Sequence, residues 1–271
     1  MVGRRYAEPI QFAELAGRDR PLRLEYQWVG DAASTRPVVV FLHEGLGSLA
    51  MWKNFPRHLC EAHGLRGLVY SRYGYGQSTP KPPGERWPVD FMHTQAREVL
   101  PALLQQLGIT RPWLFGHSDG GSIALLHAAS QPTAGVVAMA PHIRVEDLSI
   151  ASIERARDTY ETTDLPQRLG RYHADAESAF RGWNDIWLAP EFRGWTIEHE
   201  LPAITCPVLA VQGVDDEYGT LEQIRGIARR VPQTRLLELV ECGHSPHRDQ
   251  ADVVIREAGR FIAGRPETPE T

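Results

Sequence analysis

The stretch that decides the fold is Trp113-Leu114-Phe115-Gly116-His117-Ser118-Asp119-Gly120-Gly121. An apolar run that predicts a buried strand ends at Gly116, and the small residues from Ser118 to Ala129 predict a helix. The five residues from Gly116 to Gly120 match the pattern G-x-S-x-G, in which glycines allow a strained turn to lift a serine Oγ clear of a sheet. Ser118 is therefore a candidate nucleophile, although a glycine-flanked serine is also common as a turn residue or helix N-cap.

Further apolar runs predict strands that are covered on both faces of a largely parallel sheet. They lie at 37–42, 67–70, 112–115, 135–139 and 207–211, and another strand is expected at 234–239. Helix-length segments lie at about 50–63, 90–107, 118–130, 219–231 and 249–263. Two short mixed runs, 10–15 and 22–28, predict an antiparallel hairpin at the sheet edge. Strands that alternate with helices imply right-handed crossovers and a doubly wound α/β sheet.

One region departs from this alternation. Residues 141–201 contain no strong strand signal but a helical stretch at 149–162 and the tryptophans Trp183, Trp187 and Trp195. We interpret 141–201 as a helical cap inserted into a core formed by 1–140 and 202–263. The polar, proline-containing end, 264–271, is predicted to be a disordered tail.

The composition excludes several classes of protein. The formal net charge is -5 and the sequence has no long basic run, so it does not indicate a nucleic-acid-binding surface. There is no signal-peptide pattern and no apolar run long enough to span a membrane, so a cytoplasmic protein is expected. The 3 cysteines, Cys60, Cys206 and Cys242, are widely spaced and predict neither a disulfide framework nor a metal site.

Three more segments, each after a predicted strand, carry candidate chemistry. His43-Glu44-Gly45-Leu46-Gly47 is a glycine-rich turn whose backbone amides can face a developing oxyanion. The loop from Gly213 holds Asp215, Asp216 and Glu217, and a carboxylate there can orient a histidine. His244 follows the strand at 234–239 and can act as a general base. Taken singly, these segments are equally compatible with an ordinary turn, a solvated acidic loop and a surface histidine. A metal held by His244 and His247 lacks a third ligand at convincing spacing.

The order serine, acid, histidine is the order of α/β-hydrolase triads. Over residues 20–263 the sequence resembles the α/β-hydrolase fold superfamily, and the resemblance implies a Ser118, Asp216 and His244 triad. Asp216 is preferred to Asp215 because the family acid stands three residues after the glycine. Two departures are visible: Glu44 stands where the oxyanion loop usually has glycine, and Ser71 and Tyr73 replace Asp and Arg of a D-x-R-G-x-G-x-S motif.

The resemblance also implies roles around the triad. The amides of Gly45 and Asp119 match the oxyanion hole. Within the superfamily, the sequence is similar to the biphenyl hydrolase-like or valacyclovir hydrolase group, in which the acid at the position of Asp119 binds the substrate's α-amino group. A carboxylate in the first turn of a helix is also favourable through the helix dipole alone. Trp183 and Trp187 are candidates for an apolar substrate pocket or for the core of the cap.

The expected activity is hydrolysis of a small-molecule ester through an acyl-enzyme, without a cofactor and by a monomer or homodimer. Amino-acid esters are a candidate substrate because of Asp119. The same fold also serves carbon-carbon bond hydrolases of ring-cleavage products, enol-lactone hydrolases and small-molecule receptors, so these classes stay open.

Overall fold

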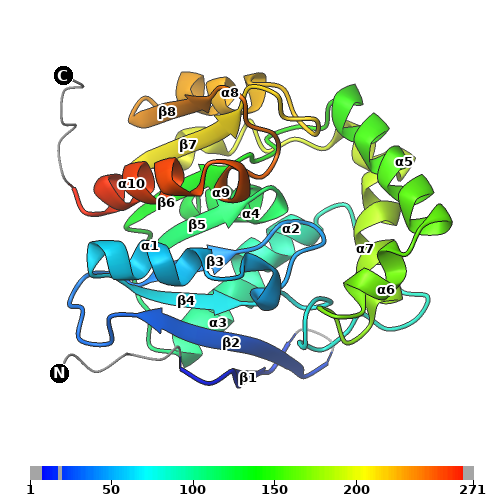
Figure 1. The fold of residues 1–271 in the computed structure, drawn as a ribbon, viewed down its shortest axis with the longest axis horizontal. Coiled ribbons are helices and arrows are strands. Elements are labelled where there is room, and N and C mark those ends of the chain that lie inside the picture. The colour runs from blue at the N-terminus through cyan, green and yellow to red at the C-terminus, as the bar shows by residue number, and fades with distance from the viewer. Residues whose placement is uncertain (1–7, 18–19, 265–271) are drawn as a thin grey trace.

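The computed structural model describes residues 8–17 and 20–264. Its centre is an 8-stranded sheet in the order β1-β2-β4-β3-β5-β6-β7-β8 (Figure 1). The strands are β1 (Gln11–Leu15), β2 (Leu22–Gly30), β3 (Val39–Leu42), β4 (Arg66–Tyr70), β5 (Trp113–His117), β6 (Gly135–Met139), β7 (Val208–Gly213) and β8 (Thr234–Leu239). The predicted edge hairpin is confirmed, because β1 and β2 pair antiparallel. From β4 to β8 every neighbouring pair is parallel, which confirms a doubly wound, mostly parallel α/β sheet.

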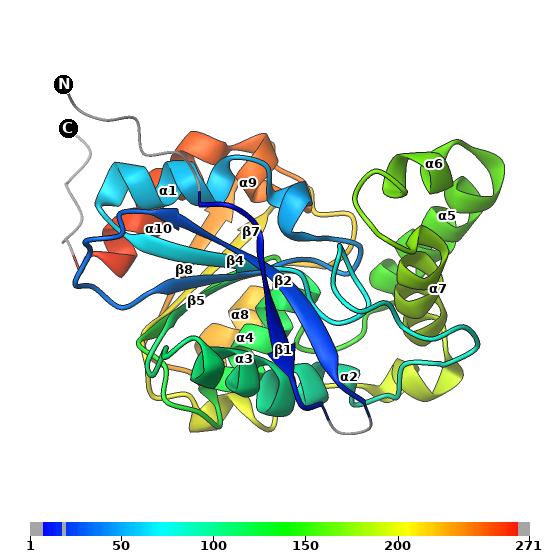
Figure 2. The same cartoon turned by 90° about the horizontal axis from the view of Figure 1, so that it is seen from below.

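Two helical layers cover the sheet, as Figure 2 shows. One layer holds α1 (Phe55–His63), α9 (Pro246–Asp249) and α10 (Ala251–Ile262), and the other holds α2 (Phe91–Thr94), α3 (Leu100–Gln106), α4 (Asp119–Ala128) and α8 (Glu222–Arg230). Side chains alternate across the strands, so Val40 and Leu42 join one core while Val39 and Phe41 join the other. This double burial explains why the central strands read as continuous apolar runs.

Three predicted helices differ from the structure in their boundaries. The helix expected at 50–63 is divided into a 3-10 turn, η1 (Leu49–Trp52), and α1, because Lys53 has a φ of 54°. The helix expected at 90–107 contains a π-helical turn, η2 (Gln95–Val99), between α2 and α3. The helix expected from 219 begins at Glu222.

A group of helices lies beyond the carboxyl ends of the parallel strands (Figure 1). It comprises α5 (Asp147–Thr162), α6 (Leu165–Leu169), α7 (Ala176–Trp187) and η3 (Pro190–Gly194), whereas the later 3-10 turn η4 (Leu201–Ala203) packs against α8. The two ends of this group of helices lie side by side. Arg144 and Thr196 form an isolated antiparallel bridge, and the Ile197 N–H donates to the Ile143 carbonyl at 2.8 Å. The group therefore faces the edge of the sheet at which parallel strands present their loops.

Two expectations concern the ends of the chain and the membrane. The tail predicted at 264–271 lies, from 265 onwards, outside the described residues. Across residues 8–17 and 20–264, no helix combines the length and the apolar character that a bilayer crossing requires.

Truncation of Phe41 tests the core packing of the sheet. Phe41 is fully buried and packs against Trp52 and Phe115 at ring-centroid distances of 5.7 and 5.3 Å. Phe41→Ala should lower the free energy of unfolding by about 3–5 kcal/mol in urea titrations. The control Val240→Ala, at a side chain 70% exposed, should change it by less than about 0.5 kcal/mol. Equal effects of the two changes would contradict the described packing.

Candidate active site

Ser118 occupies the turn between β5 and α4, with φ 52° and ψ -121°. A non-glycine residue rarely adopts this left-handed φ, so the surroundings must hold it there. A Cβ at Gly116 would lie 2.2 Å from the Gly120 carbonyl oxygen, and a Cβ at Gly120 would lie 2.1 Å from that of Leu42. Both glycines are therefore required for the close backbone approach that forms the turn, as the pattern predicted.

The structure brings the three predicted residues together in one hydrogen-bonded chain. Nε2 of His244 lies 3.0 Å from Oγ of Ser118, and Nδ1 lies 2.9 and 3.0 Å from the two carboxylate oxygens of Asp216. A carboxylate only accepts, so the proton sits on Nδ1 and Nε2 is free to accept from the Ser118 hydroxyl. A serine, a histidine and a carboxylate in this arrangement can serve as nucleophile, base and orienting acid.

Of the three acids in the loop after β7, Asp216 contacts the imidazole. Its side chain is 1% exposed, whereas Asp215 and Glu217 are exposed. Gln212 Nε2 donates to Asp216 Oδ2 at 3.1 Å, and the Tyr218 N–H donates to Oδ1 at 2.8 Å. Burial opposes ionisation of Asp216, but the hydrogen bonds from His244 and from the Tyr218 N–H hold its pKa below the ordinary value.

A second histidine supports the loop of the first. The ring of His117, which precedes Ser118, donates from Nε2 to the His244 carbonyl at 2.7 Å. The Glu217 carboxylate accepts from the His244 N–H at 3.2 Å. On the other side His142 lies with its ring 5.9 Å from that of His244, and burial lowers the pKa of His142 to about 3. The backbone of His244 is thus held by contacts that its sequence context did not reveal.

Glu44 does not disrupt the glycine-rich loop after β3. Its carbonyl accepts from His43 Nδ1 at 2.7 Å, from Arg72 Nη2 at 2.8 Å and from the Gly47 N–H at 3.0 Å. A trans peptide holds its C=O and the following N–H on opposite sides, so these bonds direct the Gly45 N–H away from Arg72 and His43. The Glu44 carboxylate lies between two other side chains, 3.6 Å from His117 Nδ1 and 3.5 Å from Arg248, and the Glu44 side chain is 18% exposed.

Asp119 is held by other protein groups. Trp187 Nε1 donates to its Oδ1 at 3.2 Å, and Oδ2 lies 4.0 Å from Arg72 Nη2. Both charged side chains are 1% exposed. Burial raises the pKa of Asp119 to about 6, even though Arg72 and Trp187 favour the charged form. Arg72, to which the sequence assigned no role, therefore places a buried cation 4.0 Å from the side chain of the residue that follows Ser118.

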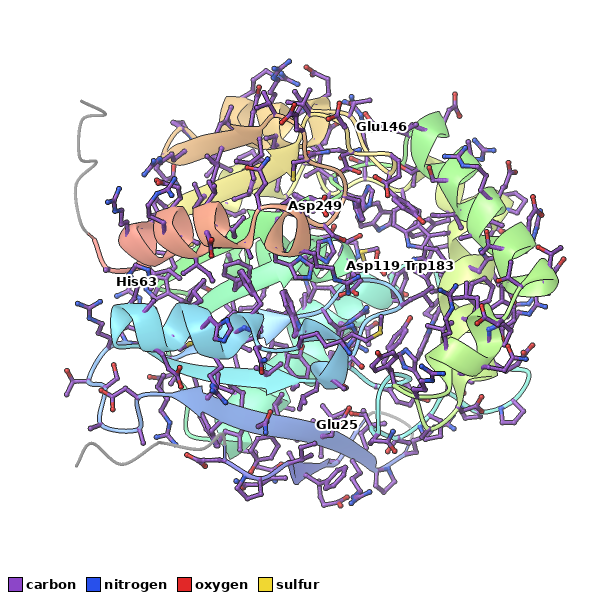
Figure 3. The ribbon with its side chains drawn as sticks, in the orientation of Figure 1. Glu25, His63, Asp119, Glu146, Trp183 and Asp249 are labelled. Atoms are coloured by element: carbon purple, nitrogen blue, oxygen red, sulfur yellow. The ribbon has the colours of Figure 1, made fainter. Side chains whose placement is uncertain are left out.

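The two tryptophans from α7 lie directly over this region, and Figure 3 shows Asp119 and Trp183 between the sheet and α7. Trp183 covers Gly45 so closely that a Cβ there would lie 2.2 Å from its indole ring. Trp187 is 1% exposed and packs against His142, Phe192 and Trp195. Within the described residues, no group of three His, Cys, Asp or Glu side chains is arranged to hold a metal ion.

The chain belongs to the alpha/beta hydrolase family, whose model matches residues 39–257. It is a hydrolase of that family, similar to several characterised members. It is 27% identical to the human serine hydrolase BPHL over 72% of this chain and 68% of that protein. It is 24% identical to esterase YbfF of Escherichia coli over 83% of this chain and 92% of that one. A 32% match to a mouse sn-1-specific diacylglycerol lipase, ABHD11, spans 48% of this chain and 41% of that protein.

Solved structures share the fold. A bacterial membrane phospholipase A superposes with a TM-score of 0.76 at 22% identity, covering 94% of this chain and 86% of the other. The enol-lactonase of Burkholderia xenovorans LB400 superposes with a TM-score of 0.72 at 22% identity, covering 93% and 100%. These likenesses confirm the α/β-hydrolase fold that the sequence predicted.

Replacement of Asp119 by asparagine tests the electrostatics of the buried pair. Because the folded-state pKa is raised from 3.8 to about 6, ionisation of Asp119 opposes folding above that pH, and the penalty fades as the pH falls towards 4. The full penalty is at most about 3 kcal/mol. The free energy of unfolding of the wild type minus that of Asp119→Asn should therefore rise by about 1 kcal/mol between pH 7 and pH 5 in urea titrations. A constant difference would contradict the raised pKa.

Proposed function

We propose that the protein hydrolyses small-molecule carboxylic esters with Ser118 as nucleophile, His244 as general base and Asp216 as the orienting acid. The observation that carries the proposal is the continuous chain of hydrogen bonds from Ser118 Oγ through both nitrogens of His244 to Asp216. In the first step Oγ attacks the ester carbonyl while His244 Nε2 accepts the hydroxyl proton. The resulting His244 cation is stabilised by the Asp216 carboxylate.

The negative charge that develops on the carbonyl oxygen needs hydrogen-bond donors that point at that oxygen. We assign them to the backbone N–H groups of Gly45 and Asp119. Support comes from the three hydrogen bonds that fix the Glu44 carbonyl and so orient the next amide. Further support comes from the position of Asp119 as the first residue of α4, where backbone N–H groups have no partner within the helix.

Collapse of the tetrahedral intermediate breaks the ester bond and passes the proton from His244 to the departing alcohol, leaving an acyl group on Ser118. Water then attacks with His244 again as base and releases the acid. We assign 141–201 as a cap that excludes bulk water from these steps, and Trp183 over Gly45 as the wall next to the substrate carbonyl. Support comes from the low exposure of Ser118, 7%.

The geometry favours esters without an ammonium group. Amino-acid esters would require Asp119 as an anion free to pair with the α-ammonium, and its Oδ2 is indeed without a hydrogen-bond partner within the described residues. However, Arg72 lies 4.0 Å from that oxygen and Trp187 holds the other one. A second cation would enter beside a buried guanidinium and be repelled by it. We therefore assign the Asp119 side chain to linking the Ser118 turn with α7.

Removal of the nucleophile tests the proposed chemistry. Wild type should release p-nitrophenol from a short-chain ester with a burst, and Ser118→Ala should lose the burst and at least about a thousandfold of kcat. Ser130→Ala, an exposed serine near the end of α4, is the matched control and should keep both. Ester turnover that survives Ser118→Ala would contradict the assignment. If a vinylogous diketone or an enol lactone is turned over far faster than any ester, that compound class and not the ester would be assigned as the substrate.

Asp119→Asn separates the two ester classes. We expect the change to alter kcat/KM for the p-nitrophenyl ester of L-valine and for p-nitrophenyl isovalerate by the same factor, within about threefold, because the side chain contacts protein groups rather than an ammonium. The two esters differ only in the amino group. A selective loss of tenfold or more for the valine ester would show that Asp119 binds the ammonium.

A further inference from the structure

A cavity of about 690 Å³ lies between the core and the helical group, apart from the Ser118 turn. Its walls come from η1 and α1, from α6 with the loop that follows, and from α9 and α10. We call it the basic groove. Its volume falls within the roughly 300–1,000 Å³ of small-molecule sites. None of Ser118, Asp216 and His244 is among the described residues that line it.

The charge of the basic groove is opposite to that of the whole chain. Lys53, Arg168, Arg171 and Arg248 line it, and none of its described lining residues is acidic. All four side chains are exposed, whereas the protein carries a formal net charge of -5. A concave site lined by one sign of charge concentrates ligands of the other sign. The groove thus favours an anion over a neutral or cationic ligand.

Part of this positive charge is uncompensated. Arg168 pairs with Asp164 at 3.2 Å, and Arg248 lies 3.5 Å from Glu44. Neither Lys53 nor Arg171 has an acidic partner among residues 8–17 and 20–264. Lys53 instead donates to the Tyr172 hydroxyl at 2.8 Å and lies over the Tyr172 ring. These two cations are available to a ligand.

Lys53 is also held in an uncommon conformation. Its φ of 54° and ψ of -130° place a long cationic side chain where glycine is usual. Its N–H donates to the Ala50 carbonyl at 3.3 Å, which closes the 3-10 turn. The strain separates η1 from α1 and puts Lys53 at the groove rather than on a continuous helix. Strained residues of this kind gather at binding and catalytic sites.

Beneath the cations the basic groove is apolar. Trp52, Phe55 and Leu169 are buried side chains that line it. Leu165 and Ile255 are half-buried and extend the same surface. A ligand that contacts both the cations and the apolar side chains has an anionic head and an aliphatic body. A ligand with only one of these features would leave part of the groove without contacts.

We propose that the basic groove binds a single-chain amphiphile with an anionic head, such as an alkyl phosphate or a fatty carboxylate, its head held by Lys53 and Arg171 and its chain lying on Trp52, Phe55 and Leu169. The site is separate from the proposed ester chemistry and goes beyond it. It reaches the active site indirectly, since Arg248 at its edge also contacts Glu44, next to Gly45.

Calorimetric titration of decyl phosphate, below its micellar concentration, into the full-length Ser118→Ala variant tests the proposal. That substitution lies outside the groove, so the result does not depend on the proposed ester chemistry. We expect saturable binding to one site. Hexyl phosphate should bind at least about tenfold more weakly, since each buried methylene contributes about fourfold. Inorganic phosphate and decyltrimethylammonium should give no saturable binding.

Charge reversal locates the site. Lys53→Glu and Arg171→Glu, each added to Ser118→Ala, should weaken decyl phosphate binding by about fivefold or more. Arg36→Glu in the loop before β3, an exposed arginine outside the groove, should leave it unchanged. Thermal unfolding of each variant should match that of the parent, because the three side chains are exposed.

Several results would overturn the proposal. The first is absence of decyl phosphate binding. The second is binding of decyltrimethylammonium or inorganic phosphate with the affinity of decyl phosphate. The third is an affinity for decyl phosphate that neither charge reversal changes. Co-sedimentation with vesicles of phosphatidylcholine and phosphatidylglycerol, without decyl phosphate binding, would assign the cations to a bilayer surface instead.

Discussion

The left-handed backbone of Ser118 is the constraint on which the geometry of the proposed active site depends. A serine at φ 52° persists only because β5 and α4 meet at Gly116 and Gly120 without side chains between them. The same close approach sets α4 against the end of β3, since a Cβ at Gly120 would strike the Leu42 carbonyl. The strand that leads into the proposed oxyanion loop and the turn that carries the proposed nucleophile are thus fixed relative to each other by one backbone contact.

A second set of contacts ties the remaining loops to this turn. His117 donates across the sheet edge to the His244 carbonyl, and Gln212 at the end of β7 holds the Asp216 carboxylate. The loops after β5, β7 and β8 are therefore joined by side-chain hydrogen bonds as well as by the sheet. In the proposed reaction, such contacts keep His244 within reach of Ser118 before any substrate arrives, which lowers the entropic cost of the reaction.

The sequence predicted the features that local chemistry dictates and missed those that depend on distant contacts. Continuous apolar runs located the strands, and G-x-S-x-G located the turn, because each is a local requirement of backbone and burial. The break at Lys53 was missed although Pro56, in the first turn of α1, is a local signal for the start of a helix. The buried pair of Arg72 and Asp119 was missed because it joins the loop after β4 to α4, which are far apart in the chain. No local pattern marked His117 or Gln212 as partners of the histidine and the acid.

Covalent labelling with a fluorophosphonate, followed by peptide mass spectrometry, tests the central claim most directly. Such a reagent phosphonylates an activated serine, so its position reports which hydroxyl has a base beside it. The account predicts one modified peptide, containing Ser118, and loss of the label in His244→Ala. A label on another serine, or ester turnover by a protein whose Ser118 stays unmodified, would contradict it.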